Sequence, residues 1–503
     1  MYTVKIKPDI LEHRLDCGFY NPVGLSATEK LHSSVEVKKI FELVDKKRKI
    51  TNGVRGPEWA ISVYKLIRLQ DCNYWMVNSD DAASISKIQF EENRRCKLRV
   101  NDIVVAIGGY IGNAAVVVKQ CEAVIGQHSA VLPEPEQVGV DSRFLVAYLN
   151  SKFAEAIFSR YVSGTVQAGI NLEDLRDLPA PSPNSTVQKY IGDKVRQAER
   201  LRAWEKSLEI KLDSFTQRYQ PEQKTPSSLA SMVSPDLMTD MLTATTYRDH
   251  YIKNQKNLRA KAKTTSISHF LQSVTNGFDE RDELAEGLPY VKVADVHAGY
   301  INVKNAPKIR ISALDDASTK QKPKQGDLLL TRKGTFGVAA VVMESTDFLC
   351  SSEVFSCKPK KTEFMPILSW FLNSPAGNMQ FWQFSTGTTM PGINQENLGN
   401  ILIPDFSDVD LDGFNSLHEL RHKAKKNSEL LTESAKLLVE ALIEGQLIET
   451  ELVAAEQALQ AGNDQLDRRI LNRLKTDGID GQRPALFADL DELYHLLTQA
   501  QGD

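Results

Sequence analysis

Short apolar segments occur twice along the chain in the same order, separated by polar turns. In the first region, apolar runs at 103–107 and 114–118 flank a glycine-containing turn, and in the second region the runs lie at 328–331 and 338–343. Runs of this length on either side of a glycine turn are typical of a β-hairpin. After each hairpin we expect a helix (142–160 and 365–383), a Gly/Thr loop, a short polar helix and a strand that ends at proline. The pattern therefore predicts two α+β domains of the same design.

The loop after the predicted helix shows the duplication most clearly. Its two versions are SGTVQAGINLEDL at 163–175 and STGTTMPGINQENL at 385–398. Upstream, Asp102 and Gly109 of the first hairpin align with Asp327 and Gly334 of the second, and all these matches lie 223 to 225 residues apart. A period this long exceeds that of solenoid repeats and indicates a duplicated domain.

A long helical segment without internal proline follows each domain copy. Apolar residues recur seven positions apart in both segments, a spacing that favours a helix–helix seam over a simple amphipathic surface helix. A helix packed only on its own domain is the alternative. The residues predicted to form the seam are Leu201, Leu208, Phe215, Leu417, Leu431 and Leu438.

The predicted order along the chain is domain, helix, domain, helix and tail. Each helix is expected to start just beyond a segment rich in proline or aspartate, which breaks regular structure. The boundaries that follow are 1–182 for the first domain, 183–222 for the first helix, 223–406 for a linker and the second domain, 407–446 for the second helix, and 447–503 for an acidic, helical carboxyl-terminal extension.

The charge is unevenly distributed, although the net charge is only -4. Residues 440–503 contain 13 acidic and 5 basic residues, a net of -8, so the remaining 439 residues contain 52 acidic and 56 basic residues, a net of +4. Basic clusters close to both copies of the repeat indicate a surface that binds phosphate, against the alternative of ordinary solvated faces. These clusters are Lys46 to Lys49, Lys253 to Lys263, and Lys320, Lys322 and Lys324.

The hairpin turns and the Gly/Thr loops supply the other candidate contact residues. Glycine lets the backbone approach a partner closely, and threonine hydroxyls can bind phosphates or base edges. The alternative is that these glycines only satisfy turn geometry. The candidate residues for contact with a phosphate-bearing partner are Lys46, Lys47, Arg48, Lys49, Thr165, Arg332, Lys333, Thr388 and Thr389.

Sequence motifs of common enzymes are missing. The sequence contains no phosphate-binding G-x-x-x-x-G-K-[ST], no glycine-rich turn of the kind that holds S-adenosylmethionine, and no histidine pair at metal-ligand spacing. Asp9 with Glu36-x-Lys38 could be read as part of a nuclease site, but such triplets are common by chance. The six scattered cysteines and the lack of a secretory or membrane-spanning segment favour a cytoplasmic protein with reduced thiols. We expect no catalytic centre, no metal and no cofactor in this chain.

These features resemble the specificity (S) subunits of type I restriction–modification enzymes. The resemblance rests on RLDCGFYNP at 14–22, the paired hairpins, the paired Gly/Thr loops and the two long helices, and it covers about residues 1–445. It implies two target-recognition domains that each bind one half of a split double-stranded DNA sequence, with the two helices forming an antiparallel coiled-coil spacer. It also implies two methyltransferase (M) subunits, which bind S-adenosylmethionine and methylate adenine, and restriction (R) subunits with an ATP-dependent translocase.

Two departures from that family leave open the wider system in which the chain acts. The second copy has only a faint echo of RLDCGFY, in TYRDHYIKN at 246–254, and the extension after about 446 is longer than the simplest members need. The alternative function is a non-catalytic scaffold or toxin-neutralising interaction protein that uses the same duplicated fold without reading sequence. Binding to random duplex libraries separates the two hypotheses.

Overall fold

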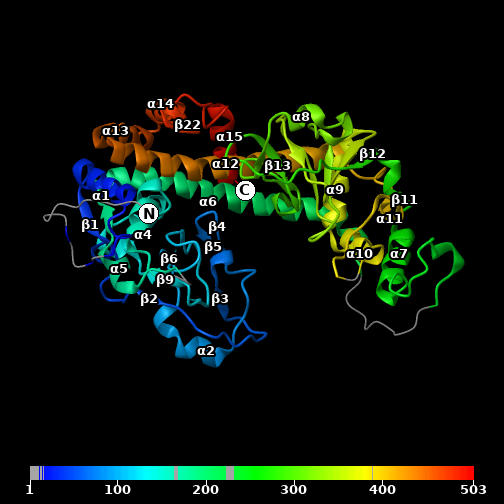
Figure 1. Ribbon diagram of the computed structural model, residues 1–503, viewed down its shortest axis with the longest axis horizontal. Coiled ribbons are helices and arrows are strands. Elements are labelled where there is room, and N and C mark those ends of the chain that lie inside the picture. The colour runs from blue at the N-terminus through cyan, green and yellow to red at the C-terminus, as the bar shows by residue number, and fades with distance from the viewer. Residues whose placement is uncertain are drawn as a thin grey trace. The chain divides into compact units, whose positions relative to one another are not determined.

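The structure is a computed structural model that describes the chain except for residues 1–10, 12, 13, 15, 164–167, 222–231, 388 and 503. The chain divides into two compact units, formed by 1–204 with 424–503 and by 205–423. Each unit contains one α+β domain and part of each long helix, α6 (Ser185–Thr216) and α12 (Leu411–Glu444) (Figure 1). Within the described residues, no helix combines the length and the hydropathy that a membrane crossing requires.

The first domain consists of helices α1 (Pro22–Ser34), α2 (Lys87–Glu92), α3 (Ser142–Leu149), α4 (Lys152–Tyr161) and α5 (Leu172–Asp177) and strands β1 (Val37–Lys39), β2 (Thr51–Asn52), β3 (Lys65–Ile67), β4 (Cys72–Asn73), β5 (Met76–Val77), β6 (Ile103–Ala106), β7 (Ala114–Val116), β8 (Ala123–Ile125), β9 (Ser129–Leu132) and β10 (Pro179–Pro181). Six strands form one sheet in the order β2-β9-β6-β7-β5-β4. Strand β3 pairs in parallel with β8, and β1 pairs antiparallel with β10. The predicted hairpin is confirmed as β6–β7, with Ile103 opposite Val116.

The second domain consists of helices α7 (Asp249–Lys261), α8 (Ala313–Asp316), α9 (Met365–Asn373), α10 (Pro375–Gln383) and α11 (Gln395–Leu398) and strands β11 (Thr264–Ser266), β12 (Leu271–Asn276), β13 (Leu288–Val291), β14 (Val296–His297), β15 (Tyr300–Ile301), β16 (Lys308–Ile309), β17 (Leu328–Thr331), β18 (Ala339–Val341), β19 (Leu349–Cys350), β20 (Val354–Pro359) and β21 (Leu402–Pro404). Its main sheet has the order β12-β20-β17-β18. The helices and strands follow those of the first domain almost one for one, so the predicted duplication is confirmed. Helix α7 occupies the place of α1, although the sequence of the second copy has only a faint echo of the RLDCGFY segment in this region.

The apolar run in the second hairpin lies between two hydrophobic layers. Leu328 and Leu330 of β17 belong to a core cluster with the phenylalanines of α9 and α10, whereas Leu329 between them belongs to a separate cluster around Val291. Successive side chains of a strand point to opposite faces. The run is continuously apolar because both faces of this strand are covered.

The single helices predicted over 142–160 and 365–383 are each divided into two. Ser151 accepts a hydrogen bond at Oγ from the backbone N–H of Ala154 (3.3 Å) and so caps α4. Ser374 caps α10 in the same way through Gly377 (3.4 Å), with Pro375 in the first turn. Serine at the cap and proline in the first turn are strong signals for a new helix start.

The residues of the predicted helix seam fall into both units. In the first unit, Leu201 of α6 and Leu431 and Leu438 of α12 are fully buried. In the second unit, Leu208 is buried, and Phe215 and Leu417 pack partly buried against the core of the second domain.

Contacts inside the second unit define the direction of the helix segments. Phe215 of α6 meets Phe414 of α12 edge to face, with ring centroids 5.4 Å apart. Six residues earlier on α6, Glu209 binds Arg421 of α12 at 2.6 Å. The two segments therefore run antiparallel, as the resemblance implies.

The carboxyl-terminal extension contains α13 (Glu449–Gln460), α14 (Gln465–Arg473), β22 (Leu474–Lys475), β23 (Gly478–Ile479) and α15 (Leu490–Gly502). A buried cluster joins it to α6 within the first unit. Lys194 Nζ lies 2.6 Å from both carboxylate oxygens of Asp467, and both side chains are 1% exposed. The hydroxyls of Tyr190 and Tyr494 donate to the same carboxylate. The extension is thus mostly helical, with one short hairpin.

Candidate nucleic-acid interface

The Gly/Thr loop and the hairpin turn lie side by side in both domains. In the first domain, the backbone N–H of Ile170 donates to the carbonyl of Ile107 (3.0 Å), and Gly108 forms a bridge with Gly169. The base of the loop is closed by reciprocal hydrogen bonds between Ser163 and Gly169, at 2.9 and 3.0 Å. The chain therefore places its two most distinctive turns next to each other.

The second domain repeats this junction bond for bond. The backbone N–H of Ile393 donates to the carbonyl of Arg332 (2.9 Å), and Lys333 forms a bridge with Gly392. Reciprocal hydrogen bonds of 2.8 and 3.0 Å between Thr386 and Gly392 close the loop. The repeated sequence is explained by this shared backbone connection, which leaves the side chains on the junction free to differ.

Glycine is required where each hairpin turn meets a helix. Gly112 has φ +92°, and a Cβ there would lie 3.0 Å from the ring of Phe158 on α4. Its counterpart Gly337 has φ +84°, and a Cβ would lie 2.8 Å from the ring of Phe381 on α10. Both the left-handed backbone and the close contact exclude larger residues. These glycines hold the hairpin turns in fixed positions.

Arg48, which the sequence groups with three lysines as a DNA contact, is held in a buried ion pair. Its guanidinium donates to both oxygens of Asp102 (2.6 and 2.9 Å) and to the carbonyl of Lys97 (2.9 Å). Asp102 is completely buried. Bidentate pairing with a buried carboxylate makes Arg48 a structural residue. Lys46, Lys47 and Lys49 are exposed and stay candidates for phosphate contact.

The second domain satisfies the equivalent carboxylate in a different way. Lys358 on β20 pairs with Asp327 (2.5 Å) and also donates to the carbonyl of Lys322 (2.6 Å). In each domain the aspartate also accepts from the backbone N–H three residues earlier, which closes the turn before the hairpin. The pair therefore stabilises the approach to the hairpin in both copies.

The other predicted contact residues lie on or near the junction. Arg332 packs over the ring of Phe355 (5.3 Å) and donates to the carbonyl of Ser352 (3.1 Å), so it is partly buried. Lys333 and Thr389 are exposed. Thr165 and Thr388 lie outside the described residues.

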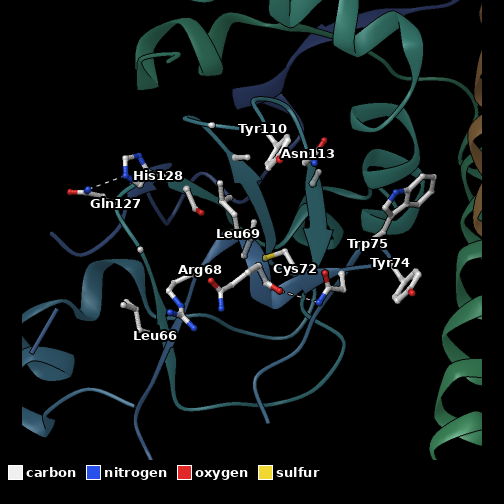
Figure 2. A pocket seen from close by; sticks show the side chains of 18 of the residues that line it. Leu66, Arg68, Leu69, Cys72, Tyr74, Trp75, Tyr110, Asn113, Gln127 and His128 are labelled. Atoms are coloured by element: carbon white, nitrogen blue, oxygen red, sulfur yellow. Dashed lines mark hydrogen bonds between the residues drawn. The ribbon is translucent and has the colours of Figure 1, made fainter. Parts of the chain in front are cut away.

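A cavity of about 970 Å³ opens beside the junction in the first unit, and the sequence did not predict it. Its walls include Trp59, Arg68, Tyr110 and His128, with an apolar floor from the central sheet. Figure 2 shows Tyr110 and Asn113 at the hairpin turn, the pair Gln127–His128 on one side, and Tyr74 and Trp75 on the other. Trp59, Tyr74, Trp75 and Tyr110 are the aromatic residues in the sequence that could have pointed to this site.

One wall of the cavity is a strained two-residue turn between β4 and β5. Tyr74 and Trp75 both have positive φ, 53° and 64°, a conformation that costs bulky residues about 1 kcal/mol or more each. Arg202 of α6 donates to the carbonyl of Tyr74 (2.8 Å) and lies over its ring, and Lys425 of α12 donates to its hydroxyl (3.2 Å). The two helices of this unit thus hold the turn in its strained form.

The cavity differs between the two domain copies. The counterpart of Tyr74–Trp75 is Ala298–Gly299, where Gly299 takes the positive φ of 68° without strain. Tyr110 aligns with Thr335, and His128 aligns with Glu353. The large aromatic side chains of this site therefore belong to the first domain alone.

The single cysteine of the cavity is protonated at neutral pH. Burial, together with the neighbouring Asp71 carboxylate, raises the pKa of Cys72 to about 12. A thiol that stays neutral is a poor nucleophile. The cavity thus presents flat aromatic faces, polar side chains and one arginine. This lining is suited to binding a ligand and not to nucleophilic attack by the cysteine.

Part of the chain matches a known family and a known protein in sequence. The family described as "Type I restriction modification DNA specificity domain" matches residues 33–213. The specificity subunit of the type I restriction enzyme EcoBI from Escherichia coli is 29% identical over 154 residues, 31% of this chain and 32% of that protein. The match therefore spans about a third of the length of this curated relative.

Solved S subunits cover most of the chain at low similarity. The type I restriction–modification S subunit from M. genitalium has 14% identity and a TM-score of 0.40, covering 82% of this chain and 96% of that one. The HsdS subunit from Thermoanaerobacter tengcongensis has 13% identity and a TM-score of 0.28, covering 82% and 97%. The likeness to type I specificity subunits rests on the sequence matches, and residues 33–213 match the type I restriction modification DNA specificity domain.

Proposed function

We propose that this chain is the non-catalytic subunit that recognises DNA in a type I restriction–modification complex, with each domain recognising one half of a bipartite target. The observation that carries the proposal is the duplicated junction of hairpin and Gly/Thr loop, built on the same backbone bonds but carrying different side chains. Identical frames with different exposed residues suit the recognition of two different half-sites. Contacts to phosphate would position each domain, and contacts to base edges would specify the sequence.

The proposal includes the partners that the family implies. The chain would act in the cytoplasm and direct methyltransferase subunits, which would bind S-adenosylmethionine, and restriction subunits with an ATP-dependent translocase. No cofactor is assigned to this chain. A scaffold that does not read sequence is the competing function, and no observation on the described residues favours it.

Selection from a random duplex pool with the full-length chain tests the proposal. We expect two short conserved blocks separated by a spacer of fixed length. Replacing residues 35–180 by the same segment of a relative should change one block and leave the other unchanged. Recovery of unselected sequence would contradict DNA recognition, and a change in both blocks would contradict one domain for each half-site.

The lysines next to Arg48 in the first domain allow a separate prediction. Replacing Lys46, Lys47 and Lys49 together by alanine should weaken binding to all duplexes alike. The salt dependence of the binding constant should become shallower, by about 0.9 in the log–log slope for each phosphate that the variant no longer neutralises. Titrations at several salt concentrations measure this slope, and an unchanged slope would show that the cluster is only solvated.

Arg48→Ala is the control for this experiment. It leaves Asp102 buried without its cation, so it should lower the stability of the first domain. The three lysine substitutions should leave the melting temperature unchanged.

A further inference from the structure

The aromatic cavity of the first domain has a shape that differs from what the reading of paired base edges requires. Such reading needs side chains that project into a groove, whereas this site is a hollow beside the junction. The second domain carries out the same proposed task with Ala298, Gly299 and Thr335 at the corresponding positions. The cavity therefore calls for a function that is specific to the first half-site.

The lining fits a flat heteroaromatic ring attached to a phosphate. Trp59 is 56% exposed and Tyr110 is 78% exposed, so both present open ring faces on which a base can stack. The guanidinium of Arg68 lies 5.7 Å from the centre of the Trp59 ring and pairs through Nε with Asp71 (3.3 Å), and the arginine side chain is 37% exposed. Gln127 and His128 are joined by a 3.0 Å hydrogen bond and add polar atoms opposite the turn. The cavity has the size of a site for a complete small ligand.

Exposed apolar residues lie in the same loop as Trp59. Ile61 is fully exposed, and Val63 is 73% exposed. Exposed aliphatic side chains on DNA-binding proteins can insert between base pairs and unstack them. A stacking cavity next to a potential wedge provides the two parts that removal of a base from the helix needs.

We infer that the first domain takes one base of its half-site out of the duplex and binds it in this cavity, with Trp59 and Tyr110 stacking on the base and Arg68 contacting its phosphate. The inference rests on the proposed function, because it assumes that this domain binds the first half-site. The strained Tyr74–Trp75 turn agrees with it, since strain of this kind persists where the exact position of a side chain matters. Base extrusion would add specificity, because the cost of unpairing depends on the base pair.

The test uses the target obtained by selection and the full-length chain without methyltransferase, because methyltransferases themselves extrude bases. 2-Aminopurine, whose fluorescence rises when it is unstacked, is placed singly at each position of both strands. We expect a several-fold rise on binding at one position of the first half-site. An abasic site at that position should be bound at least as tightly as the intact target, whereas an abasic site elsewhere in the half-site should weaken binding.

The variant Trp59→Ala with Tyr110→Ala should abolish the fluorescence rise and leave selection at the second half-site unchanged. Both side chains are largely exposed, so the variant should fold like the parent. Thr335→Ala, at the position in the second domain that matches Tyr110, is the control and should change neither result. A target bound with no rise at any position, a rise that the double variant retains, or a rise in the second half-site would overturn the inference while leaving the proposed function intact. Failure to select any target would instead refute the proposed function.

Discussion

Asp467→Ala should destabilise the first unit by about 3–5 kcal/mol, because it leaves the Lys194 ammonium buried without a counter-charge. The hydroxyls of Tyr190 and Tyr494 would lose their acceptor in the same substitution. The carboxyl-terminal extension should then separate from α6. Hydrogen exchange across α14 and α15, which reports local opening, should increase strongly while exchange in the second unit stays unchanged.

Asp464→Ala is the matched control on the same segment of chain. Its carboxylate pairs with Arg468 at the surface, where an ion pair contributes about 1 kcal/mol or less. Replacing the ion pair by an apolar pair, with Lys194→Met and Asp467→Leu in one variant, should recover most of the stability that Asp467→Ala loses. If Asp467→Ala exchanged no faster than Asp464→Ala, the buried cluster would not be what holds the extension.

The same cluster predicts how the attachment depends on pH. Burial alone would raise the pKa of Asp467, but the Lys194 ammonium and the tyrosine hydroxyls hold it below its usual value. A carboxylate whose pKa is lowered in the folded state stabilises the folded protein fully at pH values above its unfolded-state pKa of about 3.9. This contribution is lost as the pH falls through the folded-state pKa. The extension should therefore stay attached at neutral pH and loosen only below about pH 4.

Leu431→Asp should be the other strongly destabilising substitution, with a loss of several kcal/mol from an unpaired buried charge. Leu431 is completely buried in the first unit, and Leu208, which is 1% exposed in the second unit, should respond in the same way. Both variants should lower the melting temperature and either lose the fixed spacing between the two selected sequence blocks or fail to bind. Thermal melting and sequence selection measure the two effects.

Neighbouring residues of the same helices supply the controls. Ile210→Asp on α6 replaces a side chain that is 68% exposed, and Leu430→Asp on α12 replaces one that is only partly buried. Ile210→Asp should leave both measurements unchanged, and Leu430→Asp should have a smaller effect than Leu431→Asp. Equal losses at Leu208 and Ile210 would show that burial in the helix contact is not the cause.

Local patterns were sufficient to predict much of the fold. The hairpins, the Gly/Thr loops, the short helices and the terminal strands depend on turn residues and apolar runs that lie close together in sequence. Duplication doubled that signal, because Gly109 and Gly334 mark the same turn twice. The junction between loop and hairpin could not be predicted, since it joins segments about 60 residues apart through backbone bonds that no side-chain pattern specifies.

The role of Arg48 shows where charge patterns mislead. In the sequence it is the third of four consecutive basic residues, and all four look equally able to bind phosphate. Its partner Asp102 lies 54 residues further on, so only the folded chain separates this arginine from its neighbours. Sequence reasoning could not tell a paired cation from an exposed one.

Seven-residue spacing identified the apolar part of the long helices but not the polar part. His418, Asn427 and Ser428 of α12 are buried. Burial lowers the pKa of His418 to about 3, so its ring is neutral and packs between aromatic rings. Polar residues at buried positions break the apolar pattern on which prediction depends.

The aromatic cavity could not be predicted from the sequence for a different reason. Its lining residues come from segments that are far apart in the chain and meet only after folding.

The two ways of neutralising the hairpin aspartate limit how these domains can evolve by recombination. The first copy supplies its cation upstream, as Arg48, and has Pro133 where the second has Lys358; the second has Gln272 where the first has Arg48. A crossover between the copies just before the aspartate would give one hybrid with two cations and a reciprocal hybrid with a buried carboxylate and none. Exchange of whole domains preserves each pair. A crossover that separates the aspartate from its own cation should therefore give one unstable hybrid, so an exchange that keeps both domains stable has to carry the aspartate and its cation together.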